Sequence, residues 1–197
     1  MARIGLKSMT YAVLSSGGAG SAAVYTDGTL VGNNMIKADV SIQREDVSLY
    51  ADNGRVEHAN GVTGGTITLE LARLDDTMKE NILGMYKDDS DVLHVIDADA
   101  PYVGFGYVTC EIANGVKSYI GYWFHKVQFG TDSDSAETKG ENTTFQSESL
   151  TGSIMGVQLS SGGNTEFYQT FADSDEADVV AWLKSCAGIT TSGGGVG

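Results

Sequence analysis

Alternation of apolar and polar residues with a period of two is the main pattern of the chain. It is clearest in Ile36–Gln43, where even positions are apolar and odd positions polar, and it returns in Thr66–Leu71. Such alternation predicts strands with one buried face. Further strands, several of them rich in Val, Ile and Tyr, are predicted at Met9–Leu14, Val92–Ile96, Tyr102–Ile112, Val116–Phe129 and Ser149–Leu159. The pattern therefore predicts a mainly β protein.

Glycines punctuate the predicted strands in two ways. Asn114-Gly115 supplies the positive φ angles of a tight turn and predicts a hairpin between the strands on either side. Gly104, Gly106 and Gly121 lie inside strands, where they indicate bulges or close backbone approach, as in a sheet that curls into a barrel.

Two helices are predicted among the strands. The first is capped by Asp75 or Asp76, has one apolar face and ends at Gly84. The second begins at Asp173, which with Glu176 resembles a capping box. The other residues that predict this helix are Val179, Val180, Leu183 and Cys186 on one face, Lys184 near its end and Gly188 as its stop.

Three polar segments are predicted as loops: Ser15–Ser21, Asp52–Gly65 and Gly130–Asn142. The last is long for a connection inside a compact domain, and such loops are usually functional or disordered. A length of 197 residues fits one domain. We expect that domain to occupy residues 1–187, followed by a flexible Gly-rich tail at 188–197.

Charge narrows the range of functions. The chain has 26 acidic and 12 basic residues, a formal net charge of −14. Non-specific nucleic-acid binding depends on Lys and Arg, so this charge argues against it, although plain solubility explains the charge equally well. The chain has neither an apolar run of about 20 residues nor a signal-peptide pattern at its start. We therefore expect Cys110 and Cys186 to be reduced, buried thiols.

No motif gives a convincing catalytic or ligand site. Gly18–Ala23 matches a dinucleotide-binding pattern, but the residues after it predict a hairpin, Val24–Leu30, and not the required helix. Asp132 and Asp134 resemble the start of a calcium loop that lacks its glycine, because Glu137 stands there. The three histidines, His58, His94 and His125, are scattered over different elements. The aromatic run Tyr119, Tyr122, Trp123 and Phe124 is interpreted as a core or interface strand. We expect no catalytic residue, no cofactor and no metal.

Ten short segments, in this order and spacing, carry a resemblance to a known family. They are Ile4–Lys7, Val40–Ile42, Ser48–Asp52, Gly65–Leu69, Ala100–Tyr107, Asn114–Val116, Lys126–Phe129, Thr138–Glu141, Phe145–Gly152 and Phe171–Leu183. Together they resemble the major tail protein of long, flexible-tailed bacteriophages, the siphoviruses. The most specific parts are Pro101–Tyr107 and Thr138–Glu141.

The resemblance implies a fold, a location and partners. The fold is a β-sandwich or small barrel with a flanking helix and a C-terminal helix. The function is that of a non-catalytic virion protein, which forms hexameric rings stacked into the tail tube that conducts the genome. Its partners are itself, the tape-measure, tail terminator and baseplate proteins, and double-stranded DNA that passes without specific binding. Assembly takes place in the bacterial host cytoplasm. A carbohydrate-binding or host-surface-binding β-sandwich is the alternative.

Two groups of residues are predicted to serve assembly. The polar sides of the two alternating strands are expected to face the channel: Lys37, Asp39, Ser41, Gln43, Thr66, Thr68 and Glu70. An outer, merely solvated face is nearly as good an interpretation. Tyr50–Thr63 and Gly130–Asn142 are expected to be arms between subunits or rings, mobile in the free subunit. Their candidate residues are Tyr50, Asp52, Arg55, Glu57, His58, Asp132, Asp134, Glu137, Lys139 and Glu141.

Overall fold

The structure is a computed structural model. It describes residues 2–16, 22–26, 28–32, 35–51, 54–96, 99–133, 147–160 and 163–189. The strands are β1 (Ala2–Ser16), β2 (Val24–Tyr25), β3 (Thr29–Gly32), β4 (Met35–Ala51), β5 (Gly54–Leu71), β6 (Tyr86–Lys87), β7 (Leu93–His94), β8 (Tyr102–Ala113), β9 (Val116–Ser133), β10 (Glu148–Met155), β11 (Val157–Gln158), β12 (Thr165–Glu166) and β13 (Tyr168–Asp173). The helices are α1 (Asp76–Leu83) and α2 (Glu176–Lys184).

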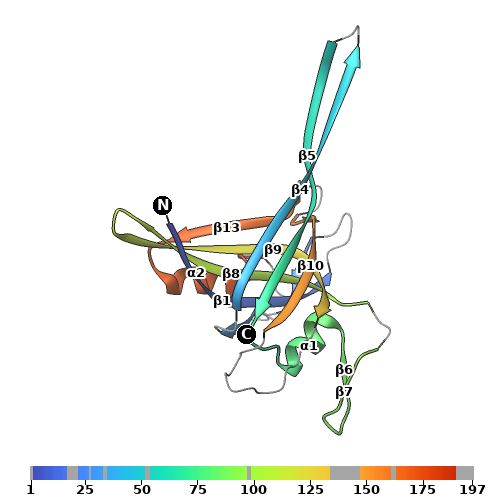
Figure 1. Cartoon of the computed structure of the whole chain (residues 1–197), viewed down its shortest axis with the longest axis vertical. Coiled ribbons are helices and arrows are strands. Elements are labelled where there is room, and N and C mark those ends of the chain that lie inside the picture. The colour runs from blue at the N-terminus through green and yellow to red at the C-terminus, as the bar shows by residue number, and fades with distance from the viewer. Residues whose placement is uncertain are drawn as a thin grey trace, which may run out of the picture.

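Nine of the described strands form one antiparallel sheet that folds over its own core. Its order is β2-β1-β8-β9-β10-β5-β4, with β3 added on β1 and β13 added on β9. The long strand β9 belongs to both halves, because its first part pairs with β8 and β13 and its second part with β10. The halves pack face to face as a sandwich (Figure 1), and the described strands do not close into a barrel.

The core has two parts. The larger lies between the halves of the sheet and joins Phe105 and Phe124 to Ile67, Leu69 and Leu150. The smaller lies under α2, and its members are Ala12, Ala23, Tyr25, Val108, Trp123, Val157, Val179, Leu183 and Cys186. Burial of this much apolar surface is the main favourable term for folding.

Several local predictions are confirmed. Asp75 caps α1 by accepting a hydrogen bond from the Met78 backbone N–H at 2.8 Å, and Gly84 ends the helix at a φ of 70°. The predicted hairpin turns at Asn114-Gly115, both with positive φ. The three strand glycines allow close approach: an added Cβ would lie 2.4 Å from the Trp123 ring at Gly104, 2.7 Å from Leu183 at Gly106 and 2.8 Å from Val179 at Gly121.

Other predicted boundaries of helices and strands were wrong. The cap of α2 is Asp175, whose carboxylate accepts from the Ala177 N–H, while Asp173 holds the turn before it by accepting from the Asp175 N–H. Only Leu93–His94 of Val92–Ile96 is a strand. Ser149–Leu159 divides at Gly156, where an added Cβ would lie 2.3 Å from Thr165. Val24–Leu30 is not a hairpin, because β2 and β3 both pair with β1.

The predicted loops are shorter than expected. Ser15 and Ser16 extend β1, Gly54–Gly65 belongs to β5, and Gly130–Ser133 is the end of β9. Polar composition suggested loops at these places, but each stretch has a backbone partner: β2 for the end of β1, β4 for the first part of β5 and β10 for the end of β9. Residues 17–21, 52–53 and 134–142 lie outside the described residues.

His125 on β9 is fully buried beside the smaller core. Its backbone carbonyl accepts a hydrogen bond from the Tyr25 hydroxyl at 2.7 Å, and its backbone N–H donates to Phe167 O at 3.1 Å. Neither ring nitrogen has a hydrogen-bond partner among the described residues, and the nearest charge is the Glu166 carboxylate, 4.0 Å from Nε2. Burial lowers the pKa of His125 to about 4, against the smaller opposing effect of Glu166.

This burial predicts a pH-dependent stability. Between pH 6.5 and 4 the unfolded chain binds a proton at His125 that the folded chain does not, so stability is present at neutral pH and lost as pH falls through this window. The loss should be on the order of 2–3 kcal/mol. Urea unfolding at several pH values measures it, and His125→Leu should flatten the curve. The control His94→Gln, at a half-exposed histidine, should keep the slope. An unchanged slope in His125→Leu would disprove the assignment.

Candidate functional site

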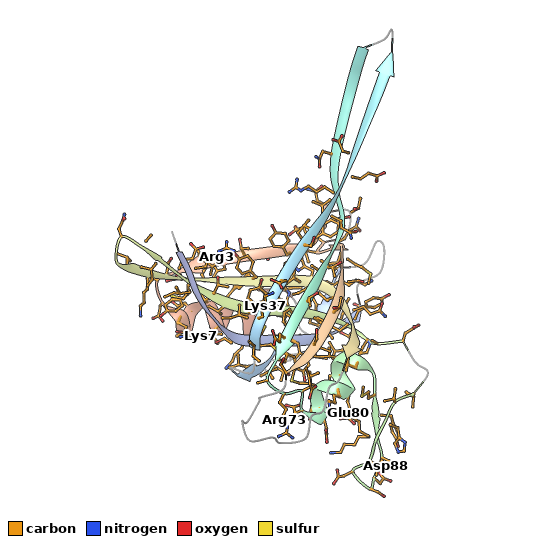
Figure 2. The ribbon with its side chains drawn as sticks, viewed as in Figure 1. Arg3, Lys7, Lys37, Arg73, Glu80 and Asp88 are labelled. Carbon is orange, nitrogen blue, oxygen red and sulfur yellow. The ribbon has the colours of Figure 1, made fainter. Side chains whose placement is uncertain are left out.

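The polar sides of β4 and β5 form one continuous face. Lys37 lies opposite Glu70, and Asp39 opposite Thr68, while Ser41 lies opposite Thr66 one step further along. Directly opposed residues of an antiparallel pair share a face of the sheet. The pairing therefore brings six of the seven predicted channel residues together, and Gln43, opposite Gly64, continues the row. Figure 2 shows Lys37 on the part of β4 that crosses the body of the molecule.

The same face extends over two more strands. On β10, Ser149 lies opposite Glu70, Thr151 opposite Thr68 and Ser153 opposite Thr66. On β9, Gln128 follows, opposite Ser153. The sequence analysis missed these four residues as part of the face. The alternation was visible in Ser149–Ile154, but nothing in the sequence placed β10 beside β5. We call this four-stranded surface the polar face; its residues are Lys37, Asp39, Ser41, Gln43, Thr66, Thr68, Glu70, Ser149, Thr151, Ser153 and Gln128.

Short polar contacts organise the polar face. The Thr68 and Thr151 hydroxyl oxygens lie 3.4 Å apart, and the Ser147 hydroxyl donates to Glu70 Oε1 at 2.6 Å. Lys37 forms an ion pair with Asp39 two residues away on the same strand, and this hydrogen bond raises the pKa of Lys37. The polar face contains three charged side chains, those of Lys37, Asp39 and Glu70, which carry both signs. Its other side chains are neutral. The surface is thus hydroxyl-rich and nearly neutral.

The opposite side of these strands is the floor of the larger core. Ile67, Leu69 and Leu71 alternate with the polar residues of β5, and each is fully buried. Leu150 and Ile154 do the same on β10. A shift of register by one residue would exchange these two sides, so the buried side fixes which side faces outward.

Strand β4 is an edge of the sheet, and its inward side is incompletely covered. Among the described strands it pairs with β5 alone. Val40, opposite Ile67, lies on the same side as the buried residues of β5, yet it is 36 % exposed. Ile36 stands at the register shift between Met35 and Lys37 and is 55 % exposed. An edge with exposed apolar side chains is a surface for pairing with another chain.

Beyond the body, β4 and β5 continue as a two-stranded arm. Figure 1 shows it projecting along the long axis of the molecule. The antiparallel pairing continues from Arg44 opposite Val62 to Ala51 opposite Gly54, with one register shift between Leu49 and Tyr50, over about 25 Å at 3.3 Å per residue. We call residues 44–62 the arm. An isolated two-stranded hairpin is at best marginally stable in water.

The predicted arm residues divide between strand and undescribed positions. Tyr50, Arg55, Glu57 and His58 lie on the strands of the arm, where a loop was expected. Asp132 lies near the end of β9. Asp52, Asp134, Glu137, Lys139 and Glu141 lie outside the described residues.

The remaining candidate residues lie in the core or in packing contacts of the described part of the chain. Trp123 and Phe124 are in the core, while Tyr119 and Tyr122 carry Lys7 and Arg3 over their rings. Cys110 and Cys186 are buried and form no disulfide. The described residues contain no group of three or more His, Cys, Asp or Glu side chains placed to hold a metal ion. Neither described helix is long and apolar enough to cross a membrane.

Substitution to Ala should affect the two sides of β10 differently. A Cβ at Gly152 would meet Phe129 Cδ1 and Val127 Cγ1 at 2.7 Å in the core. We expect Gly152→Ala to cost about 1–3 kcal/mol through overpacking. The adjacent Ser153→Ala, on the polar face, should change stability by less than about 0.5 kcal/mol. Thermal unfolding of both variants measures the contrast, and equal effects would contradict the assigned sides.

Comparison with known proteins identifies the family. A family model described as phage tail tube protein matches residues 2–181, which is most of the chain. No curated protein matches the sequence. The match covers both halves of the sheet, the arm and most of α2. The chain therefore belongs to the phage tail tube protein family, whose members are structural proteins of the virion tail that self-assemble into a tube.

Proposed function

We propose that this chain forms hexameric rings that stack into the tube of a long, flexible tail, with the polar face lining the channel through which the genome passes. The role is structural and non-catalytic. The tape-measure protein, tail terminator and baseplate are the other partners, and assembly takes place in the host cytoplasm. The ring number and the other partners are inferred from the resemblance of the sequence to the family. The assignment of the channel wall is inferred from the polar face.

The observation that carries the proposal is a polar face backed by core and bounded by two open edges. One edge is β4. The other is the end of β9, since β8 begins at Tyr102, opposite Gln128, and no described strand flanks residues 129–133 on that side. Joining β4 of one copy to β9 of the next would pair both edges and bury Ile36 and Val40. Head-to-tail contacts of this kind close into rings.

The chemistry of the polar face suits passage of DNA. Hydroxyl groups and side chains of both signs offer a polyanion few strong contacts, whereas basic side chains would bind phosphates at every ring. Charge at the wall acts over about 10 Å at 0.1 M salt. A nearly neutral surface therefore leaves DNA hydrated and able to slide. In the stacked tube, the arm reaches from one ring to the next.

The first test of the ring is the β4 edge. Ile36→Lys places a charge where the proposal buries an apolar side chain, so we expect a folded subunit that no longer forms rings or tubes. The control is Val116→Lys, which is 66 % exposed at the β8–β9 turn and should assemble normally. Native mass measurement and negative-stain microscopy give the result. Normal tubes from folded Ile36→Lys, or a wild-type chain that stays monomeric at high concentration with its tail partners, would refute the proposal.

The test of the channel is the charge of its wall. Changing both Asp39 and Glu70 to Lys should allow tubes to assemble but slow DNA delivery, most strongly at low salt where screening is weakest. The control is Asp178→Lys, which introduces the same kind of charge change at an exposed position of α2 that is not part of the polar face. DNA ejection from assembled particles is timed at two salt concentrations. Ejection at the wild-type rate in tubes carrying both wall changes would reject this wall.

A binding module is the alternative function. The described aromatic residues with large exposure, Tyr86, Tyr102 and Tyr168, lie on three different strands, β6, β8 and β13. Nothing in this arrangement favours a sugar platform. A monomer with saturable sugar binding would favour this alternative over the tube.

A further inference from the structure

A lysine and a tyrosine border the polar face at the corner where β8 begins. On β9, Lys126 lies opposite Met155, two residues beyond the pair of Gln128 and Ser153. Because side chains alternate along a strand, Lys126 is on the same side of the sheet as that pair. Tyr102, the first residue of β8, lies opposite Gln128 and shares this side as well.

The lysine is held against the ring of the tyrosine. Lys126 Nζ lies 4.1 Å from the centroid of the Tyr102 ring, whereas the Arg3 and Lys7 cations lie 5.7 and 5.8 Å from the rings beside them. The negative face of an aromatic ring attracts a cation at such distances. Lys126 is half-buried and Tyr102 is 38 % exposed, so this contact lies at the surface.

The two lysines on this side of the sheet have different kinds of internal partner. Lys37 is paired with the Asp39 carboxylate, and Lys126 with a neutral ring. A ring restrains the ammonium group without adding negative charge to the surface. The charge of Lys126 therefore still offsets the charge of the nearby carboxylates, while its short-range contact is with Tyr102.

We propose that Tyr102 is a positioning residue, whose ring holds the Lys126 ammonium group back from the phosphates of DNA that passes along the polar face. The inference rests on the proposed channel and explains how a wall that contains lysine avoids strong contacts with a polyanion. Lys126 must leave the ring before it can bind a phosphate, which weakens each phosphate contact roughly 2–5-fold. The effect is repeated in every subunit that the DNA passes.

The first experiment removes the ring. Tyr102→Leu frees the ammonium group of Lys126, so DNA ejection from assembled particles should slow by at least about twofold. The slowing should be strongest at low salt, because phosphate contacts release counterions. Tyr102→Phe is the matched control, since it keeps the aromatic face and should eject DNA at the wild-type rate. Ejection is timed at two salt concentrations, and electron microscopy confirms that the tubes are normal.

A double variant tests whether the lysine causes the slowing. Tyr102→Leu combined with Lys126→Gln should eject DNA at the wild-type rate, a rescue that a merely structural role of Tyr102 would not give. Three results would overturn the proposal while leaving the tube intact. They are wild-type ejection from Tyr102→Leu tubes, equal slowing in Tyr102→Phe, and slow ejection in the double variant.

The second experiment measures the contact in the folded subunit, whether or not the variants assemble. The ring current of Tyr102 should shift the NMR signals of the Lys126 ε-CH₂ protons upfield. We expect Tyr102→Phe to keep this shift and Tyr102→Leu to remove it. An unshifted signal in the wild-type chain would overturn the proposal. A wild-type chain that forms no tubes with its tail partners would instead refute the proposed function.

Discussion

The two-sidedness of the β4–β5–β10–β9 sheet is the constraint on which the rest of the structure depends. Because successive side chains of a strand point to opposite faces, one register places Ile67, Leu69 and Leu150 in the core and Thr68, Glu70 and Thr151 on the polar face. The burial that stabilises the core therefore also fixes which side chains of these strands face outward. The packing that folds the protein thereby also sets the composition of the polar face.

The same sheet leaves a strand edge unpaired and several apolar side chains exposed in the described part of the single chain. Its edge strand β4 exposes Ile36 and Val40, its arm extends beyond any described contact with the body, and the α1 end exposes Val95 and Ile96. Soluble monomers usually cover or charge such features. Here they lie at the edge of the sheet and at the two ends of the long axis of the molecule.

Much of the fold could be predicted from local patterns, and the failures have physical reasons. Period two located the polar sides of β4 and β5, and Asp75 and Gly84 bounded α1, because these signals act within a few residues. The second strand of the arm was mistaken for a loop, since its polar, Gly-containing sequence does not alternate regularly. The extension of the polar face onto Ser149 and Thr151 depends on β10 lying beside β5, a pairing between distant segments that no local pattern encodes.

The most direct measurement is a helical reconstruction of the assembled tube by electron cryomicroscopy. The account predicts rings in which β4 of one subunit adjoins β9 of its neighbour, with Asp39, Thr68 and Thr151 pointing into the channel. A tube whose channel is lined by another surface, with these three residues on the outside, would contradict it.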